Sequence, residues 1–392
     1  MSQSWSSREH QGPWPPGGGV DGRPLSGVRV LELARILAGP YCTMLLADLG
    51  ADVLKVEPPG GDESRRWGPP FAGDTATYFA SANRNKRSLV LDLKQESDRL
   101  ILGELVSQAD AVVHNYTERV SAQLGIDQQW LARHNPDAIV CRISGFGAGS
   151  DHPAYDLILQ AASGLMSITG QPDGPPTKMG VAVADVATGM FAALGILAEL
   201  CARQQPSRGH QVDVSILDSA LALLVNQGAS WLASGDEPQR RGNDHPSIVP
   251  YGLFPTGKGE LVLAVGSDRQ FAALAEILGD PGLANQPRFA TNPNRVRNRT
   301  ELRMVLEEKL SSRSAEDWND RLQRAGVPCG QVRSVGEALA TVGARLVARV
   351  GEDGGSGERQ VMSPIRLGGD YLRPYAPSPK LGEAKLLDSI DD

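Results

Sequence analysis

One stretch near the N-terminus decides the fold: residues 28–57, which read VRVLELARILAGPYCTMLLADLGADVLKVE. Its first part, Val28–Leu33, is an apolar run typical of a buried strand, and a turn follows at Ala38-Gly39-Pro40. The segment Tyr41–Leu49 has helical character, and Ala51–Val56 is a second apolar run. The stretch therefore predicts a strand, a helix and a second strand, which is the repeating unit of a parallel α/β sheet.

The same alternation continues toward the middle of the chain. Apolar runs and amphipathic helical stretches follow one another as Ser88–Leu93, Glu96–Gln108, Ala111–Val113, Gln128–His134 and Ala138–Ile143. This order predicts a doubly wound parallel sheet of the α/β class. Ligands of such sheets bind beyond the carboxyl ends of the strands, so the segments to inspect are Ala34–Pro40, Asn115–Val120 and Ser144–Gly149.

The second half of the chain has a different pattern. A buried helix over Val186–Leu200, a short strand over Gln211–Ile216 and a helix over Leu217–Leu232 are expected to complete the first domain. After the polar segment 234–246, a hairpin across Thr256–Gly259 and helices near 268–278 and 299–311 predict a smaller α+β domain.

We therefore divide the chain into four parts. Residues 1–22 are rich in Gly, Pro and Ser and are expected to be a flexible tail. The expected large domain covers 23–222, the small domain with its linkers covers 223–335, and residues 336–392 are expected to return to the large domain.

Composition and charge exclude several classes of partner. The chain has 39 Lys and Arg residues against 46 Asp and Glu residues, a formal net charge of −7 that opposes binding to nucleic acid. We find no run near the roughly 18 apolar residues that a membrane span needs, and no signal-peptide pattern, so we expect no membrane association and a cytoplasmic location. Cys42, Cys141, Cys201 and Cys329 form no Cys-x-x-Cys pair, which predicts reduced, buried thiols.

Two loops are candidate phosphate sites, and each has a structural alternative. The turn at Gly39-Pro40 precedes a helix, whose N-terminal amides favour anions, but it lacks a G-x-G-x-x-G motif, so a nicotinamide cofactor is disfavoured. The basic run Asn83–Ser88 either holds phosphates with its three cations or is a solvated loop. The residues leave both choices open.

Asp185 is the carboxylate with the most informative position. It lies between Val181–Ala184 and a predicted helix, so it is either a helix N-cap or a carboxylate kept ionised, and hence nucleophilic, by the positive end of the helix. The histidines lack the spacing of metal ligands, and Ser144–Gly147 does not match a nucleophile elbow. We therefore expect no metal site and no serine hydrolase.

The chain also carries an ordered series of short motifs: Val30–Leu33 with Ala38–Pro40, Leu49–Glu57, Asn85–Ser88, Asn115-Tyr116, Ser144–Gly147, Ser163–Met166, and Ala184-Asp185 with Gly189. Together these motifs resemble the family III CoA-transferases, which include formyl-CoA transferase, carnitine CoA-transferase and the α-methylacyl-CoA racemases. The resemblance covers nearly the whole chain. It implies a Rossmann-like large domain, a smaller α+β domain and an interlocked homodimer.

The resemblance also implies a reaction and its residues. Asp185 stands where the family has its nucleophilic Asp, which would form a mixed anhydride with the acyl group and then an aspartyl-CoA thioester. No tightly bound cofactor is implied, because CoA and acyl-CoA are substrates. The positions that match the family's CoA contacts are Ile36, Leu37, Ala38, Leu91, Lys94, Asn115 and Tyr116.

Within the family, Arg65–Phe71, Tyr78-Phe79 and Ser247–Tyr251 are similar to the branch that contains succinyl-CoA:glutarate CoA-transferase. That similarity implies transfer of CoA from succinyl-CoA or another dicarboxylyl-CoA to an acid such as glutarate. A second carboxylate would be met by Arg35 or Arg66, with His245 as a helper; ordinary salt bridges are the alternative role of these side chains.

Two other functions stay open. The first is an α-methylacyl-CoA racemase or epimerase, although the His-Asp dipeptide of those enzymes is replaced by Tyr155-Asp156, and a Tyr with a pKa near 10 is a poor proton shuttle. The second is a CoA-binding homologue without catalytic activity.

Overall fold

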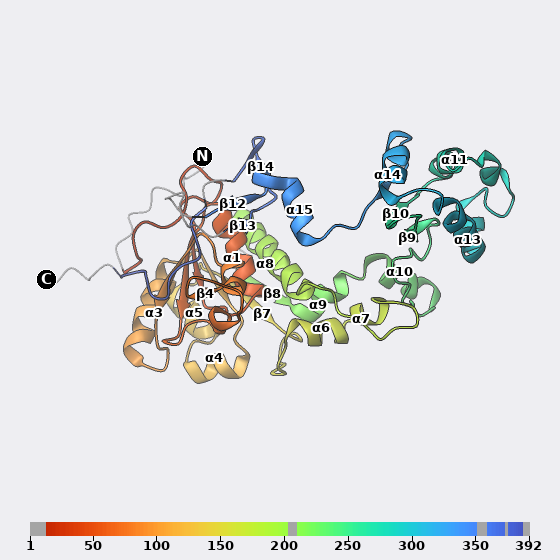
Figure 1. Ribbon diagram of the computed structural model, residues 1–392. Coiled ribbons are helices and arrows are strands. Elements are labelled where there is room, and N and C mark those ends of the chain that lie inside the picture. The colour runs from red at the N-terminus through yellow and green to blue at the C-terminus, as the bar shows by residue number, and fades with distance from the viewer. Residues whose placement is uncertain (1–12, 203–209, 351–358, 373–374, 387–392) are drawn as a thin grey trace. The chain divides into compact units, whose positions relative to one another are not determined.

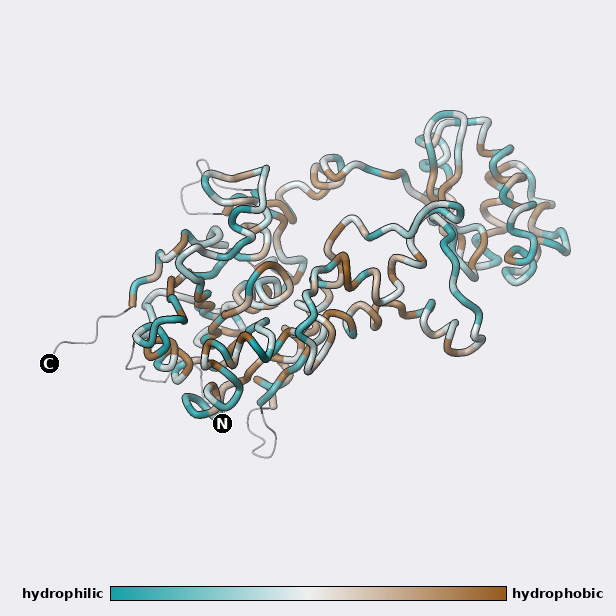
Figure 2. The backbone as a smooth tube through the Cα atoms, turned by 90° about the horizontal axis from the view of Figure 1, so that it is seen from below, coloured by the Kyte–Doolittle hydropathy of each residue, from teal (hydrophilic) through white to brown (hydrophobic). Residues whose placement is uncertain are grey.

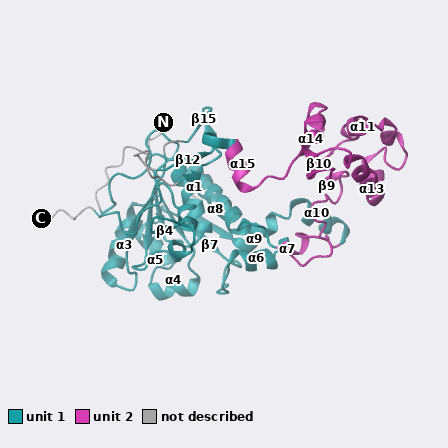
Figure 3. Ribbon diagram, viewed as in Figure 1, with its two compact units in different colours: residues 1–165, 178–236, 342–392 teal, residues 166–177, 237–341 magenta. Residues whose placement is uncertain are grey.

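The computed structural model describes residues 13–202, 210–350, 359–372 and 375–386. The chain forms two compact units: unit 1 has the bounds 1–165, 178–236 and 342–392, and unit 2 has the bounds 166–177 and 237–341 (Figure 3). The division drawn from the sequence put the changes of domain at 222/223 and 335/336 and did not include the excursion 166–177. Each unit has its own hydrophobic core.

Unit 1 is built on a six-stranded parallel sheet in the order β5-β2-β1-β6-β7-β8 (Figure 1). The strands are β1 (Arg29–Glu32), β2 (Asp52–Glu57), β5 (Lys86–Val90), β6 (Ala111–His114), β7 (Ile139–Ser144) and β8 (Gln211–Ser215). This is the strand order of the Rossmann fold, in which the direction of winding reverses between the first and the fourth strand, here β1 and β6. The predicted parallel α/β sheet is confirmed, and its switch point lies where β1 and β6 end.

Apolar residues on both faces of the sheet explain why helices cover both faces. Val30 and Val53 pack into one hydrophobic cluster, whereas their neighbours Leu31 and Leu54 pack into another. The first face is covered by α1 (Ala38–Asp48), α6 (Asp156–Ala162), α8 (Val183–Ala202) and α9 (Ile216–Ala222); the second is covered by α3 (Glu96–Gln108), α4 (Glu118–Leu124) and α5 (Gln128–His134). Figure 2 shows the brown, apolar stretches alternating with teal, polar stretches along the chain.

Helix α8 corrects one expectation from the sequence. Within the described residues it is the single helix long and apolar enough, by length and composition, to cross a membrane, whereas we expected no such segment. Half of it is buried, and Ala192, Ala193 and Ile196 belong to the core of unit 1. The helix predicted over 217–232 is also interrupted, because α10 (Val225–Ser234) begins after Leu223-Leu224 and at a positive φ of 38° at Val225.

Short elements complete the first half of the chain. They are η2 (Glu63–Arg66), β3 (Phe71–Ala72), β4 (Thr75–Ala76), α2 (Thr77–Ala80) and α7 (Leu165–Ile168). The two strands β3 and β4 form a separate antiparallel pair. All of these elements except α7 lie in the chain between β2 and β5, and η2 and α2 contribute residues to the candidate site described below.

Unit 2 contains a small antiparallel sheet in the order β11-β10-β9, with β9 (Tyr251–Pro255), β10 (Glu260–Ala264) and β11 (Cys329–Gly330). The hairpin predicted across Thr256–Gly259 is present, with Leu261 opposite Phe254. Its helices are α11 (Asp268–Ile277), η3 (Pro281–Asn285), α12 (Asn292–Arg297), α13 (Arg299–Leu310), α14 (Ala315–Arg324) and α15 (Val335–Val342).

The C-terminal segment returns to unit 1. It forms η4 (Gly343–Arg345), β12 (Val347–Arg349), β13 (Arg359–Val361), β14 (Arg366–Leu367) and β15 (Asp370–Tyr371), and then runs beside β5. The Gly382 amide donates to Ser88 Oγ at 3.1 Å, the Ala384 amide donates to the Ser88 carbonyl at 2.9 Å, and Arg65 donates to the Pro379 carbonyl at 3.1 Å.

The predicted N-terminal tail, residues 1–22, is only partly within the described chain, because residues 1–12 lie outside it. Its described part is not a free tail: Trp14 is 2% exposed and packs with the core of the second sheet face. The Trp14 indole donates to Asp52 at 2.7 Å, and Arg87 donates to the Pro15 carbonyl. The expectation of flexibility is therefore wrong from Trp14 to Pro16.

All four cysteines are free thiols. Cys42 and Cys141 are buried, as predicted, but Cys201 is exposed and Cys329 is partly exposed. Cys201 is exposed because it lies near the end of α8, beyond the residues of that helix that pack into the core.

Candidate active site

Asp185 is the third residue of α8, inside the first turn of the helix. The structure therefore differs from the N-cap alternative, because the helix begins two residues earlier, at Val183. The Asp185 residue is 8% exposed, so most of it is removed from water. A carboxylate in the first helical turn experiences the positive end of the helix dipole, which favours its ionised form.

A second carboxylate, Asp156, lies against the start of the same helix. Asp156 begins α6, and its Oδ1 accepts hydrogen bonds from the amides of Ala184 at 2.9 Å and Asp185 at 3.4 Å. The Gln160 amide group donates to Asp156 Oδ2 at 2.6 Å and so holds it in place. Asp156 thus caps α8 from another helix and brings a second negative charge beside Asp185.

Burial, and then the charge of Asp156, raise the pKa of Asp185 to about 7. No described residue forms an ion pair with Asp185 that would offset this shift. Near neutral pH the carboxylate is therefore ionised in a large fraction of molecules, but it is poorly stabilised by its surroundings. A carboxylate in this state is suited to attack an electrophilic carbonyl.

Helix α8 lies unusually close to the start of α1, and Gly189 is the reason. A Cβ atom at Gly189 would lie 2.7 Å from the Ala38 carbonyl oxygen and 3.1 Å from the Cys42 nitrogen. Only glycine permits this approach. The turn that carries Asp185 is consequently packed against the first turn of α1, which directly follows the loop at the end of β1.

Three aromatic side chains line the region around the two carboxylates. The Tyr78 and Trp67 ring centroids are 5.2 Å apart, and those of Trp67 and Tyr155 are 6.4 Å apart. Burial, followed by the charges of Asp185, Asp156 and Asp62, raises the pKa of Tyr78 to about 12, so its phenol stays protonated and can donate a hydrogen bond. Trp67 and Tyr155 are 38% and 53% exposed, so this wall is open to a ligand.

Most of the expected CoA positions gather at the switch point of the sheet. Ile36 and Leu37 follow β1, Ala38 starts α1, and Asn115 with Tyr116 follow β6. Asn115 bridges the two strand ends, because its side chain accepts from the Arg35 amide at 3.1 Å and donates to the Arg35 carbonyl at 3.0 Å. Leu37 and Ala38 are buried, so they can meet a ligand chiefly through their backbone.

Leu91 and Lys94, the two remaining expected contacts, line one pocket of about 200 Å³ together with Tyr116. We call it the Lys94 pocket. Its full lining is Arg35, Val56, Glu57, Pro58, Leu91, Asp92, Leu93, Lys94, Tyr116, Val120 and Leu124. Lys94 is exposed and forms no ion pair within the described part of the chain, so it can meet a phosphate.

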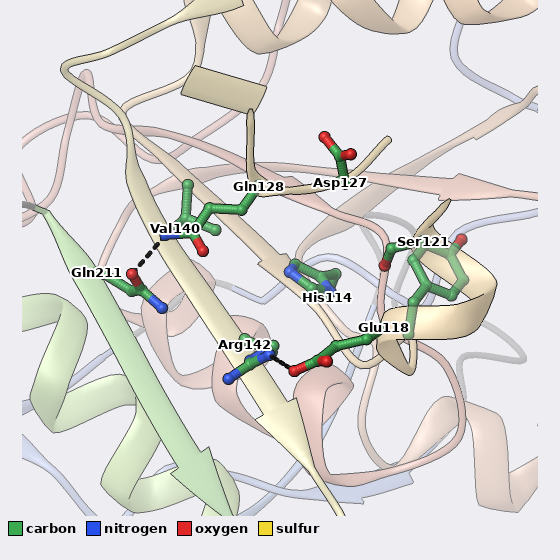
Figure 4. A pocket seen from close by; sticks show the side chains of 9 residues that line it. His114, Glu118, Ser121, Asp127, Gln128, Val140, Arg142 and Gln211 are labelled. Atoms are coloured by element: carbon green, nitrogen blue, oxygen red, sulfur yellow. Dashed lines mark hydrogen bonds and ion pairs between the residues drawn. The ribbon is translucent and has the colours of Figure 1, made fainter. Parts of the chain in front are cut away.

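A second pocket of about 190 Å³ lies on the other side of α4 and shares Tyr116 with the first. Figure 4 shows its lining, with His114 next to the ion pair between Arg142 and Glu118. Burial and Arg142 lower the pKa of His114 to about 4, so the imidazole is neutral, and Arg142 is also paired with Asp213 at 2.7 Å. This pocket offers no free cation, and the Lys94 pocket is the better site for phosphates.

The three residues expected to meet a second carboxylate do not all belong to one unit. Arg35 forms an exposed ion pair with Glu63 at 3.3 Å, and Arg66, in the same 3₁₀ helix as Glu63, donates to the Gly60 carbonyl at 2.7 Å. Both belong to unit 1, whereas His245 belongs to unit 2. Burial and Arg299 lower the pKa of His245, so it is uncharged at neutral pH.

The basic run Asn83–Ser88 has neither of the roles considered from the sequence. Arg84 is 4% exposed and pairs with Asp48 at 2.6 Å, Lys86 is 3% exposed, and Arg87 pairs with Asp52. The run is therefore neither a phosphate site nor a solvated loop. Its cations neutralise carboxylates inside unit 1.

Lys86 belongs to a buried ionic network behind the loop that follows β1. Glu32 pairs with Lys55 and with Lys86, each at 2.8 Å, and Lys55 also pairs with Asp62 at 3.0 Å. The side chains of these residues are fully buried in their ion pairs. Although burial opposes it, Lys55 and the Ser64 hydrogen bonds lower the pKa of Asp62 to about 2, so this carboxylate stays ionised.

The sequence reasoning missed Asp156 as a partner of Asp185, and it missed the ionic network. Glu32 and Lys55 did give a signal, because charged residues within apolar strands must be paired when buried. Asp62 gave none, since it stands in a loop. Among the described residues, no group of three or more His, Cys, Asp or Glu side chains is arranged to hold a metal ion.

Comparison with known proteins agrees with this geometry. A family model described as CoA-transferase family III matches residues 25–385. The chain is 43% identical to a succinate–glutarate CoA-transferase of Agrobacterium fabrum over 94% of this chain and 96% of the relative, and 39% identical to an acetyl-CoA:oxalate CoA-transferase of Acetobacter aceti over 90% and 92%. A crystal structure of a CaiB/BaiF family protein from Brucella suis is 38% identical, with a TM-score of 0.80 and coverage of 92% and 97%.

Proposed function

The chain belongs to CoA-transferase family III, and from this premise we propose that it moves CoA from succinyl-CoA to a dicarboxylic acid, with Asp185 as the nucleophile. The single observation that carries the proposal is the state of Asp185: a buried carboxylate in the first turn of a helix, with a pKa raised to about 7 and no ion-pair partner among the described residues. By contrast, Asp62 and Asp48, two buried carboxylates elsewhere in unit 1, are paired with Lys55 and Arg84.

The proposed reaction uses Asp185 twice. Its carboxylate attacks the thioester carbonyl of the donor, and the carbon–sulfur bond breaks. CoA leaves as a thiolate, and the acyl group stays on Asp185 as a mixed anhydride. The thiolate then attacks the aspartyl carbonyl, which releases the donor acid and leaves an aspartyl-CoA thioester. The acceptor carboxylate then attacks the aspartyl-CoA thioester, which releases the CoA thiolate and forms a second mixed anhydride. The thiolate attacks the acceptor's carbonyl in this anhydride, which gives the new acyl-CoA and regenerates the Asp185 carboxylate.

Neighbouring residues have supporting roles in this proposal. The neutral phenol of Tyr78 can donate to the oxyanion that forms at each attack, and such donors lower the barrier most when they are already in place. Ile36, Leu37, Ala38, Leu91, Lys94, Asn115 and Tyr116 are the proposed CoA contacts. Their supporting evidence is their common position at the switch point and in the Lys94 pocket.

We assign the second carboxylate of the acid to Arg66 before Arg35. Arg66 directly precedes Trp67, which belongs to the aromatic wall near Asp185, and its side chain is held by a single backbone carbonyl. Replacement by Gln is expected to raise KM for a dicarboxylate at least tenfold and to change KM for a monocarboxylate little, since a bidentate guanidinium contact is lost only with the former.

The test is a mass-spectrometric CoA-transfer assay. Succinyl-CoA is incubated with glutarate, malate, itaconate or oxalate, using wild type and Asp185→Ala. New acyl-CoA from wild type alone supports the proposal and identifies the acceptor, and transfer to oxalate in preference to the longer acids would identify a short dicarboxylate as the acceptor. Absence of any transfer, together with deuterium uptake at the α-carbon of a 2-methylacyl-CoA, would identify a racemase, and CoA binding without either reaction would identify a non-catalytic homologue.

We also propose a homodimer in the cytoplasm. Large apolar side chains are exposed along α8, α9 and α10, including Leu194 at 61%, Val225 at 71% and Leu232 at 79%. Exposed apolar residues at this density are typical of a surface covered by another chain. Light scattering coupled to size-exclusion chromatography should give twice the mass of the chain, and a monomer at micromolar concentration would contradict the proposal.

A further inference from the structure

The loop after β1 is held by side chains from other parts of unit 1. The Ala34 carbonyl accepts from Lys55 Nζ at 2.9 Å, and both backbone groups of Arg35 are bonded to Asn115 at 3.1 and 3.0 Å. These contacts are not part of any helix or strand ladder. Side chains therefore determine the path of the backbone at this point.

The next residue, Ile36, has a conformation that its side chain disfavours. Its φ is +73°, in the left-handed region, where β-branched residues are rarely found. The Ile36 amide donates to Asp62 Oδ2 at 3.1 Å. A strained residue persists only where its surroundings hold it, and such residues are concentrated at functional sites.

Asp62 is itself rigidly held. It is fully buried, its Oδ1 accepts from the Ser64 amide at 2.9 Å and the Ser64 hydroxyl at 2.7 Å, and its Oδ2 pairs with Lys55 at 3.0 Å. Lys55 is in turn paired with Glu32 at 2.8 Å. Because a buried ion pair adds little net stability compared with apolar residues of the same size, stability alone does not explain this arrangement.

The position of the loop gives the ion pair a role. Residues 34–36 follow β1 at the switch point of the sheet, and Arg35 also lines the Lys94 pocket. We propose that the buried Lys55–Asp62 ion pair is a positioning device that holds Ile36 in its left-handed conformation and so sets the path of residues 36–38 for CoA. The inference rests on the proposed function, because CoA is the ligand of that loop there.

A double-mutant cycle tests the role of Asp62 independently of any direct effect of Ile36. CoA affinity is measured by calorimetry for wild type, Asp62→Asn, Ile36→Gly and the double variant. Glycine adopts a positive φ without strain, so the loop no longer needs to be held when Gly replaces Ile36. Asp62→Asn should weaken CoA binding about tenfold with Ile36 in place and less than about threefold with glycine there.

Further measurements separate positioning from stability. Asp62→Asn should raise KM for the acyl-CoA donor and leave kcat within about threefold, since the reacting carboxylate is elsewhere. Asp48→Asn is the matched control: Asp48 is also buried and paired with Arg84 at 2.6 Å, and its loss should lower stability without changing CoA affinity. Ser64→Ala is a milder variant that leaves the ion pair intact, and it should also weaken CoA binding. It replaces Asp62→Asn in the experiment if Asp62→Asn does not fold.

Three results would overturn the inference. The first is an unchanged CoA affinity in Asp62→Asn. The second is an equal loss of CoA affinity on Asp62→Asn whether Ile or Gly stands at position 36. The third is a loss of CoA affinity in Asp48→Asn as large as that in Asp62→Asn. Absence of CoA binding by the wild type would instead refute the proposed function and this inference with it. Binding by the wild type that Asp62→Asn does not weaken refutes the inference alone.

Discussion

Two groups of carboxylates in unit 1 have opposite surroundings. Glu32 and Asp62 are paired with lysines at 2.8 and 3.0 Å, whereas Asp185 and Asp156 lie beside one another and no cation of the described chain is paired with Asp185. The pKa of Asp62 is about 2 and that of Asp185 is about 7. Glu32, Asp62 and Asp185 are all buried, so the counter-charge decides whether a buried carboxylate is held as structure or left available for reaction.

The largest expected effect concerns activity. Asp185→Asn should lower the rate of CoA transfer more than a thousand-fold, because the amide cannot form the anhydride. Asp48→Asn changes a buried but paired acid far from the proposed reaction and should keep its turnover. Steady-state kinetics of both purified variants measure this difference. An Asp185→Asn variant that keeps a tenth of the wild-type rate would contradict the prediction.

The next effect concerns stability and should appear in the paired group. Glu32→Gln leaves Lys55 and Lys86 without their shared carboxylate, which should lower the free energy of unfolding by about 3–5 kcal/mol. Asp156→Asn should lower it by less than about 1 kcal/mol, since an amide oxygen can still cap α8. Urea unfolding at pH 7 measures both, and equal losses would erase the difference between the two groups.

The pH dependence of stability should also separate them. The pKa of Asp185 is raised, so the carboxyl destabilises the folded protein when it ionises, with no effect below about pH 4 and the full effect above about pH 7. Asp185→Asn should therefore match the wild type near pH 4 and exceed it by up to about 4 kcal/mol at pH 8. The lowered pKa of Asp62 has the opposite sign, since its stabilisation is lost as pH falls from about 4 toward 2. Unfolding curves across this range check both signs; a variant that is no more stable than wild type at pH 8 shows that Asp185 is not strained by its burial.

The smallest effect is a shift in the pH profile of the reaction. The charge of Asp156 is the second cause, after burial, of the raised pKa of Asp185. Asp156→Asn should move the acidic limb of kcat to lower pH by roughly one unit, which corresponds to about 1.4 kcal/mol. An unchanged limb would show that burial alone sets the pKa of Asp185.

The parallel sheet could be predicted because several of its strands lie in apolar runs with turn residues beside them, and Val28–Leu33 shows this most clearly. The ionic network could not be predicted from these runs. Its pairing depends on strand order: Glu32 and Lys55 are register partners only because β1 and β2 are neighbours. Lys86 joins them from the start of β5, and Asp62 joins from a loop.

The position of Asp185 at a helix start was predictable, but its chemistry was not. The apolar residues after it indicate a helix, and this part of the prediction is present in α8. Its pKa is raised first by burial in the folded unit and then by Asp156, which stands 29 residues earlier in the chain and is brought there by the packing of α6. Such long-range contacts leave no periodic signal. For the same reason, the buried pairing of the Asn83–Ser88 cations was missed.

The two ends of the described chain meet in one core, since Trp14, Ala384 and Leu386 pack into the same hydrophobic cluster. Unit 2 lies wholly before residue 342, so it can fold while the ribosome is still adding the C-terminal segment. Unit 1 needs residues as far as Leu386 to complete one of its cores, and its many contacts between distant residues slow this last step. A nascent chain that stalls before Ala384 thus presents a folded small unit beside an unfinished large one, which is the form that chaperones would meet.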